Sequence, residues 1–120
     1  MIDKFDDIQE GNPMGVIPLK EEIILSALVM LGGSSRGAPI RKMVIGMTNK
    51  EIVYGTLYNL LENLIRKGYV TTRKSDPTPV PGGRSKTIYT ISEEGKQALQ
   101  ETLHMHETIR KRLSDLEFGV

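Results

Sequence analysis

Apolar residues recur every three or four positions in the first part of the chain, and this spacing predicts helices. The first helix covers residues 18–31, because proline and acids suit its first turn and Gly32-Gly33 ends it. After a turn at Ser34-Ser35, residues 38–45 place apolar side chains on one face and bases on the other. They predict a second, shorter helix that stops at Gly46.

The start of the third helix has two interpretations. Thr48 and Glu51 have the spacing of a capping box, which would begin the helix at Thr48. Residues 52–54 are β-favouring, so they would form a short strand before a helix that opens near Gly55, and we prefer this version. In both versions an apolar stripe predicts the helix, and it consists of Leu57, Leu60, Leu61, Leu64 and Ile65. A basic pair and Gly68 follow the stripe and end the helix.

Two segments rich in β-branched and aromatic residues follow, at residues 69–73 and 86–91. Between them, residues 76–83 hold three prolines and two glycines, so the pattern predicts a β-hairpin with a long, stiff tip. Three helices and then a hairpin is the chain order of a winged helix-turn-helix, in which the third helix enters the DNA major groove and the hairpin is the wing. The expected fold class is α+β and mainly helical.

The end of the chain predicts one long helix. Ser92 and the two acids after it form an N-terminal cap, and the helix reaches about Glu117. It is too long for one small domain to bury, so we expect its apolar side to pair with a second copy of the chain. The residues expected in this dimer contact are Leu99, Leu103, Met105, His106, Ile109, Leu113 and Leu116. In the alternative, only Leu99 and Leu103 pack on their own domain and the rest frays.

Basic residues are concentrated in the middle of the chain, although the formal net charge of the 120 residues is only +1. Residues 36–86 hold ten Lys and Arg against three acids, whereas the flanking residues 1–35 and 87–120 are both net acidic. A basic block can be a solvated surface, but it is also the electrostatic footprint of a protein that binds a polyanion. This block covers the second helix, the third helix and the wing.

Four short blocks of sequence resemble the PadR family of transcriptional regulators. They are Gly55-Thr56-Leu57-Tyr58-Asn59-Leu60-Leu61, Lys67-Gly68-Tyr69-Val70, Gly82-Gly83-Arg84-Ser85-Lys86 and Tyr89-Thr90-Ile91-Ser92-Glu93-Glu94-Gly95. One departure is that many relatives place Ser-Pro before the first block, where this chain has Val53-Tyr54. The resemblance covers about residues 20–100 and implies a homodimeric DNA-binding regulator, usually a repressor, with its last helix in the dimer interface.

This interpretation places the DNA contacts on three elements. At the start of the third helix we expect contacts from Tyr54, Gly55, Thr56, Tyr58 and Asn59, although Tyr58 suits packing between helix and wing equally well. From the wing we expect contacts from Arg73, Lys74, Arg84, Ser85 and Lys86. On the second helix, Arg41 and Lys42 are expected to meet phosphates.

Other classes of function find little support in the sequence. No nucleophile, base and orienting group share a supporting spacing, so we expect no enzyme. His104 and His106 point about 200° apart on a helix and the chain has no cysteine, so we expect no metal site and no cofactor. Residues 82–86 lack the spacing of a nucleotide-binding loop. An acidic N-terminus and the absence of a long apolar stretch predict a cytoplasmic protein without a membrane span.

The sequence therefore predicts three parts: a flexible N-terminal arm at residues 1–17, a winged helix-turn-helix DNA-binding domain at residues 18–91 and a dimerisation helix at residues 92–120. The expected function is repression of transcription by a homodimer on a palindromic operator. The alternative is a winged-helix module that holds a protein partner and does not read DNA, and the salt dependence of binding would separate the two. A further interpretation adds a small-molecule effector bound between protomers.

Overall fold

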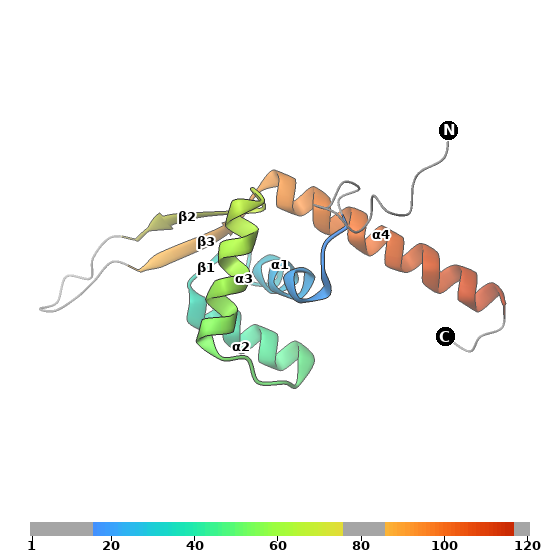
Figure 1. The fold of residues 1–120 in the computed structure, drawn as a ribbon, viewed down its shortest axis with the longest axis horizontal. Helices are drawn as coiled ribbons and strands as arrows, with labels where there is room; N and C mark the ends of the chain where they lie inside the picture. Colours follow the sequence, from blue (N-terminus) through green and yellow to red (C-terminus); the bar gives the residue numbers. More distant parts are fainter. Residues whose placement is uncertain (1–15, 76–85, 117–120) are drawn as a thin grey trace, which may run out of the picture.

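The computed structural model of the chain describes residues 16–75 and 86–116. This part of the chain forms four helices and three strands, which are α1 (Leu19–Met30), β1 (Ser34–Ser35), α2 (Gly37–Thr48), α3 (Tyr54–Arg66), β2 (Val70–Lys74), β3 (Thr87–Ile91) and α4 (Glu93–Asp115) (Figure 1). The strands make one antiparallel sheet in the order β1-β3-β2. The expected winged helix-turn-helix is confirmed.

The first helix, α1, is the centre of the hydrophobic core. Ile24, Leu25, Ala27 and Leu28 are at most 1% exposed, because α2, α3, α4 and the sheet all contact this helix. Such a helix is apolar on every side rather than along one stripe. It ends at the expected Gly32-Gly33, whose backbone φ angles of 92° and 98° are rarely adopted by residues that carry a Cβ.

The second helix is longer than expected. It continues through Gly46 to Thr48, and Asn49 ends it in the left-handed conformation with φ of 57°. The predicted stop at Gly46 is wrong because a glycine inside a helix costs only about 1 kcal/mol, while Val44 anchors this stretch in the core. Asn49 then supplies the left-handed turn that ends the helix.

The start of the third helix is close to the preferred version of the prediction. It begins at Tyr54, one residue before Gly55, and Val53 precedes it in an extended conformation. The strand expected at residues 52–54 is absent from this described segment. The capping-box start is also wrong, because the Thr48 hydroxyl donates to the Val44 carbonyl at 2.8 Å and so belongs to α2.

The hairpin forms as predicted, with Val70 opposite Ile91 and Lys74 opposite Thr87. Its tip, residues 76–85, lies outside the described residues, so Arg84 and Ser85 have no assigned contacts. Ser34-Ser35, expected as a turn, instead pairs with β3 as a short third strand. The Ser34 and Thr90 hydroxyls lie 2.7 Å apart across this pair.

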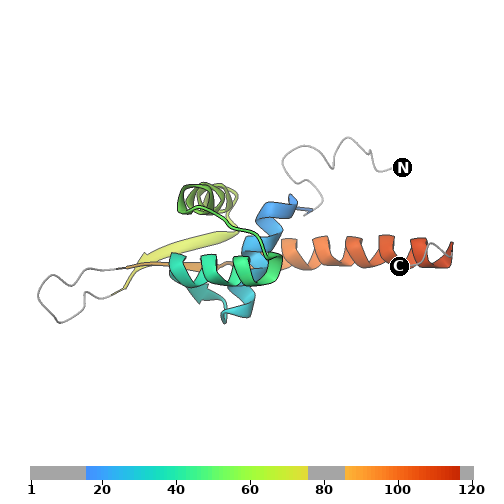
Figure 2. The same ribbon diagram turned by 90° about the horizontal axis from the view of Figure 1, so that it is seen from below.

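The last helix starts at the predicted cap, where Ser92 Oγ accepts from the Gly95 amide at 3.0 Å. Gly95 is required there, since a Cβ would collide with the Tyr69 carbonyl oxygen. The first part of α4 packs on the body, and Thr102 Oγ1 accepts from the amide of the buried Ile17 at 3.1 Å. The rest of α4 projects from the body at the end opposite to the hairpin (Figures 1 and 2).

No helix in residues 16–75 and 86–116 is both long and apolar enough to cross a membrane.

Candidate nucleic-acid interface

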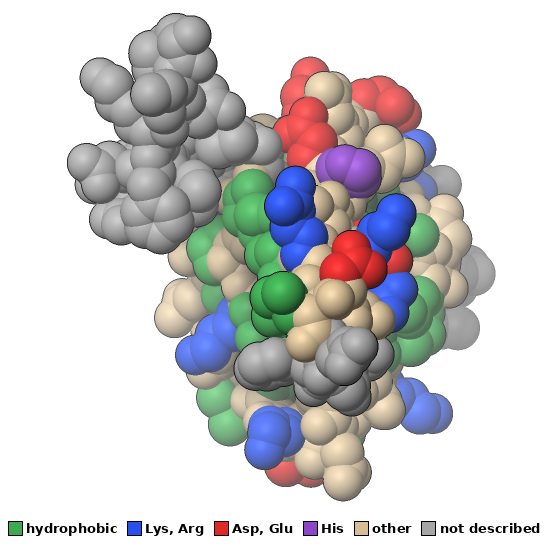
Figure 3. Space-filling model, turned by 90° about the vertical axis from the view of Figure 1, so that its right-hand side faces the viewer, with side chains coloured by type: hydrophobic (Ala, Val, Ile, Leu, Met, Phe, Trp, Pro, Cys, Tyr) green, Lys and Arg blue, Asp and Glu red, His purple; other side chains and the backbone are tan. Residues whose placement is uncertain are grey.

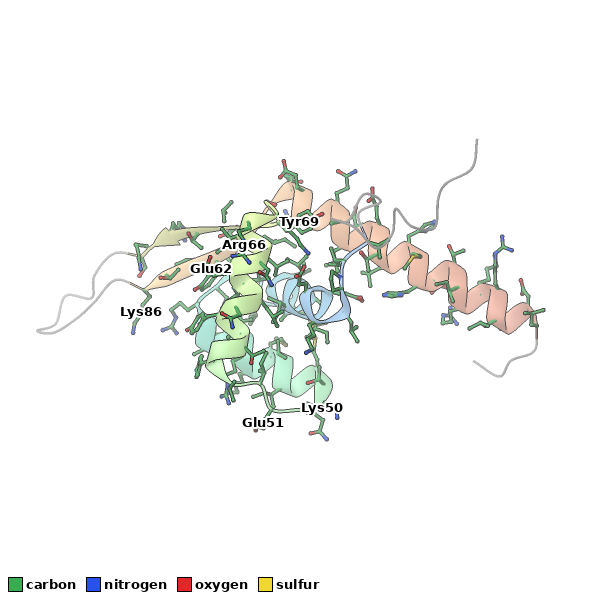
Figure 4. All side chains as sticks on the ribbon, viewed as in Figure 1. Lys50, Glu51, Glu62, Arg66, Tyr69 and Lys86 are labelled. Atoms are coloured by element: carbon green, nitrogen blue, oxygen red, sulfur yellow. The ribbon has the colours of Figure 1, made fainter. Side chains whose placement is uncertain are left out.

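The helix α3 divides into a buried side, an outer side and two flanks. Leu57, Leu61 and Leu64 are fully buried. By helical spacing, the exposed Gly55, Asn59, Glu62 and Arg66 lie on the opposite, outer side, and Figure 4 shows Glu62 and Arg66 along the helix. Of the five residues expected to face DNA, the outer side holds Gly55 and Asn59.

The other three expected residues lie on the flanks of α3. Thr56 lines a groove that α3 forms with α1 and the end of α2. Tyr54 and Tyr58 lie on the opposite flank, towards the sheet, where both remain about two-fifths exposed (43% and 41%). The expected set is thus spread over more than half of the helix circumference.

Three tyrosines connect α3 to the sheet. The rings of Tyr54 and Tyr58 stack with centroids 5.8 Å apart, and Tyr58 lies 6.4 Å from Tyr89 of β3. A Cβ on Gly37 would be 2.6 Å from the Tyr58 hydroxyl, so glycine lets this ring reach the start of α2. Tyr58 therefore packs at the junction of helix and hairpin and still exposes part of its surface.

The Tyr89 phenol keeps its proton at neutral pH. Burial, followed by the nearby Tyr58 and Glu62, raises the pKa of Tyr89 above its ordinary value of 10.0. A protonated phenol can donate a hydrogen bond to an acceptor such as a phosphate oxygen.

The side chain of Arg41 turns inwards to the loop between α2 and α3. Its Nε donates to the Ile52 carbonyl at 2.6 Å and Nη2 lies 3.1 Å from the Glu51 carboxylate. The guanidinium also lies 4.9 Å from the centre of the Tyr54 ring. Arg41 therefore holds the first turn of α3 in place, while Lys42 next to it is exposed. Figure 4 shows Lys50 and Glu51 in this loop.

A second ion pair fixes the far end of α3. Lys67 Nζ lies 2.7 Å from Glu21 Oε1, and Glu21 is only 5% exposed. The carboxylate comes from the first turn of α1, so this pair ties the end of α3 to the central helix. Arg41 of α2 thus contacts the start of α3 and Lys67 its end, in addition to the three leucines that α3 buries in the core.

The predicted wing residues divide between the two faces of the hairpin. Side chains alternate along a strand and directly opposed residues share a face, so Lys74 shares a face with its partner Thr87 and with Tyr89. Arg73 lies on the other face, opposite Ile88. Lys86 is exposed immediately before β3, at the end of the described hairpin that lies away from the body (Figure 4).

The residues expected at the dimer contact also divide into two groups. Leu99 is 6% exposed and belongs to the core of its own chain. Further along α4, Leu103, Ile109 and Leu116 are exposed, and Met105 and Leu113 are half-buried. Figure 3 looks onto this end of the molecule and shows hydrophobic side chains next to charged ones.

The two histidines lie on α4, and His106 contacts α1. Its Nε2 lies 2.9 Å from Glu22 Oε1. Within the described parts of the chain, no group of three or more His, Cys, Asp or Glu side chains could hold a metal ion.

The sequence pattern missed three residues that complete this surface, namely Arg36, Gly37 and Tyr89. Arg36 and Gly37 stand at the start of α2, beside Tyr58 of α3 and Lys86 of the hairpin. The basic charge of Arg36 was visible in the sequence. Its proximity to the hairpin was not, because it depends on how the sheet packs against α2 and α3.

Comparison of the sequence with known families gives a match that spans these elements. The model of the transcriptional regulator PadR-like family matches residues 24–101, which include all of α2, α3 and the described hairpin. A comparison with curated proteins gives no match.

Solved structures share the fold over most of the chain. A transcriptional regulator from Clostridium thermocellum has a TM-score of 0.63 at 23% identity, over 95% of this chain and 97% of that one. A PadR family transcription regulator from Clostridium difficile has a TM-score of 0.62 at 21% identity, over 79% and 96%. Bacillus subtilis PadR in complex with operator DNA has a TM-score of 0.57 at 23% identity, over 71% and 46%.

Proposed function

Because the chain belongs to the family of PadR-like transcriptional regulators, we propose that it binds operator DNA through α3 and the hairpin and represses transcription. The expected repressor acts as a homodimer on a palindromic site. Repression needs no further surface, since a dimer seated on an operator excludes other proteins from it. The similar fold of Bacillus subtilis PadR, solved with operator DNA, supports a DNA partner.

One observation carries the proposal: among the described residues, most Lys and Arg side chains of the basic segment lack an acidic partner. In the described part of residues 36–86, ion pairs engage Arg41 and Lys67. Within the same part, no ion pair engages Arg36, Lys42, Lys50, Arg66, Arg73, Lys74 or Lys86. Unpaired bases on α2, α3 and the hairpin leave a positive surface that suits DNA phosphates.

We assign the reading of DNA bases to the outer side of α3, and contact with the DNA backbone to the hairpin and α2. An asparagine on an exposed recognition helix can pair with adenine in the major groove, which makes Asn59 the first candidate. The proposed set is the one expected from the sequence: Tyr54, Gly55, Thr56, Tyr58 and Asn59 on α3, Arg73, Lys74, Arg84, Ser85 and Lys86 on the wing, and Arg41 and Lys42 on α2. For Arg41 the contacts with Glu51 and Ile52 favour a supporting part in this set.

Dimerisation is assigned to the projecting part of α4. Its exposed apolar residues continue the side that packs on α1, and a two-fold dimer matches a two-fold operator. Residues 18–91 would then read DNA, and residues 92–120 would hold the two copies together. A small-molecule effector between the protomers stays a prediction.

The salt dependence of binding tests this function against a protein-interaction module. Fluorescence anisotropy with a labelled duplex, repeated at several salt concentrations, gives the slope of log affinity against log salt. We expect a steep negative slope, since each neutralised phosphate contributes about −0.9. Absence of DNA binding, or a slope near zero, would contradict the proposal and favour a protein partner.

A further inference from the structure

A hollow of about 520 Å³ opens between the start of α2, the first turns of α3 and the first half of β3 with Lys86 before it. The lining residues that matter here are Arg36, Gly37, Tyr54, Tyr58, Lys86 and Tyr89. They come from three elements that are far apart in the sequence and meet only in the fold.

The charges around this hollow favour an anion. Arg36 and Lys86 are both exposed, and neither has an acidic partner among the described residues. Among the described residues, Glu62 of α3 is close enough for its charge to act on Tyr89. Within the described segments, Arg36 and Lys86 thus outweigh Glu62, which lies one helical turn beyond Tyr58.

The tyrosines supply a rigid, hydrogen-bonding wall. Tyr58 is held between Tyr54 and Tyr89, and its hydroxyl lies close to Gly37 at the start of α2. Among the described residues, none forms a hydrogen bond with this hydroxyl. Tyrosine hydroxyls are among the side-chain groups that contact phosphate oxygens in protein–DNA interfaces.

We propose that this hollow seats one phosphate group of the DNA backbone, with Arg36 and Lys86 supplying the charge and Tyr58 donating a hydrogen bond. The inference rests on the proposed function, because it assumes that α3 enters the major groove. If the wing lies against the DNA backbone beside that groove, the DNA strand between α3 and the wing crosses the hollow that separates these two elements. Arg36 therefore becomes a phosphate contact that neither the basic pattern nor the family blocks singled out.

The test measures binding to a short duplex of random sequence, because a phosphate contact needs no particular base. Anisotropy at several salt concentrations compares the parent with Arg36→Gln and with Arg110→Gln. Arg110 is a matched control: it is exposed, loses the same charge and lies on α4, where it pairs with Glu107. We expect Arg36→Gln to flatten the salt slope by about 0.9 for each protomer in contact with DNA, and Arg110→Gln to leave the slope unchanged.

Tyr58→Phe adds a variant that changes no charge. Loss of a hydrogen bond to a charged group should weaken binding roughly tenfold while the salt slope stays at the parent value. Thermal melting followed by circular dichroism checks that all variants are folded. Parent-like binding by Tyr58→Phe would remove the tyrosine from the proposed contact.

The outcomes separate this inference from the function on which it rests. If the parent binds DNA with a steep slope and Arg36→Gln keeps that slope, the phosphate site is overturned and the DNA-binding function stands. The phosphate site is also overturned if Arg36→Gln loses affinity at an unchanged slope, since a phosphate contact must release a counterion. If the parent itself does not bind DNA, the proposed function fails first.

Discussion

The helices α3 and α4 each bury an apolar side in the same core, but their exposed surfaces differ in chemistry. α3 buries Leu57, Leu61 and Leu64 and presents a polar outer side, flanked by tyrosines and close to basic residues that form no ion pair among the described residues. α4 buries its apolar side fully only as far as Thr102. Beyond it Met105 and Leu113 are half-buried, and Ile109 and Leu116 are 49% and 74% exposed. The two helices thus present exposed surfaces of two chemical kinds.

This difference bears on the partner proposed for each surface. A polar surface with unpaired bases gains little from a hydrophobic partner and suits a polyanion such as DNA. An apolar stripe that continues from the core gains by being covered, and a second copy of the same helix can supply the cover. Four predictions examine the contrast, from the largest expected effect to the smallest.

Breaking the buried side of α3 should have the largest effect. Leu61 is 1% exposed, so Leu61→Ala should lower the free energy of unfolding by about 2 to 5 kcal/mol through lost burial and a cavity. Urea unfolding measures the change. Asn59→Ala, on the outer side of the same helix, is the control and should change stability by less than about 0.5 kcal/mol.

Breaking the uncovered side of α4 should separate the protomers. Ile109→Asp combined with Leu113→Asp would place two carboxylates in the proposed contact, and we expect dimer dissociation to increase roughly hundredfold or more. Light scattering or sedimentation measures the oligomeric state.

The matched control for this pair is Thr108→Asp combined with Ser114→Asp, which adds the same charge away from the apolar side of α4. It should remain dimeric. A cut after Gly95 is a poor test, because it also removes Ala98, Leu99 and Thr102 from the core. A parent chain that is monomeric at tens of micromolar would contradict the proposed dimer.

Changing the outer side of α3 should affect selectivity more than affinity. Loss of a base contact costs about 1 to 3 kcal/mol at one position of the site. Asn59→Ala should therefore bind its best sequence more weakly and accept more bases at that position, while affinity for random DNA stays nearly unchanged. Competition binding with single-base variants of the site measures this, and an unchanged preference would exclude Asn59 from base reading.

Changing the basic residues of the hairpin should have the smallest and least specific effect on DNA binding. Lys74→Ala with Lys86→Ala should weaken binding to all sequences alike and flatten the salt slope by about 2 for each bound protomer. Lys96→Ala with Lys111→Ala removes the same charge from α4 and should leave the slope as it is. An unchanged slope in the hairpin variant would place DNA elsewhere.

Local signals in the sequence predicted most of the helices and the hairpin. Gly32-Gly33 ended α1, the leucine stripe identified α3, and Ser92 capped α4, because each of these features acts within a few residues along the chain. The predicted start of α3 was within one residue of the observed start at Tyr54. The β-favouring residues before it do not form the expected strand, because a strand needs a neighbour to pair with. They became the extended link into the helix.

The remaining features depend on contacts between distant residues. Ser34-Ser35 becomes a strand only because β3 lies beside it, more than fifty positions later. Arg41 looked like a free base in the sequence, but the fold brings Glu51 and the Ile52 carbonyl to it. The hollow at Arg36 and Lys86 likewise forms from segments that no periodic pattern connects.

Selection of bound sequences from a pool of random DNA, with the purified full chain, tests the central claim most directly. If α3 reads bases and α4 holds two copies together, the enriched sequences should contain two inverted half-sites, with centres about 10 base pairs or a multiple of that distance apart. Failure to enrich any sequence, while the protein remains folded, would contradict the assignment of α3 to DNA reading.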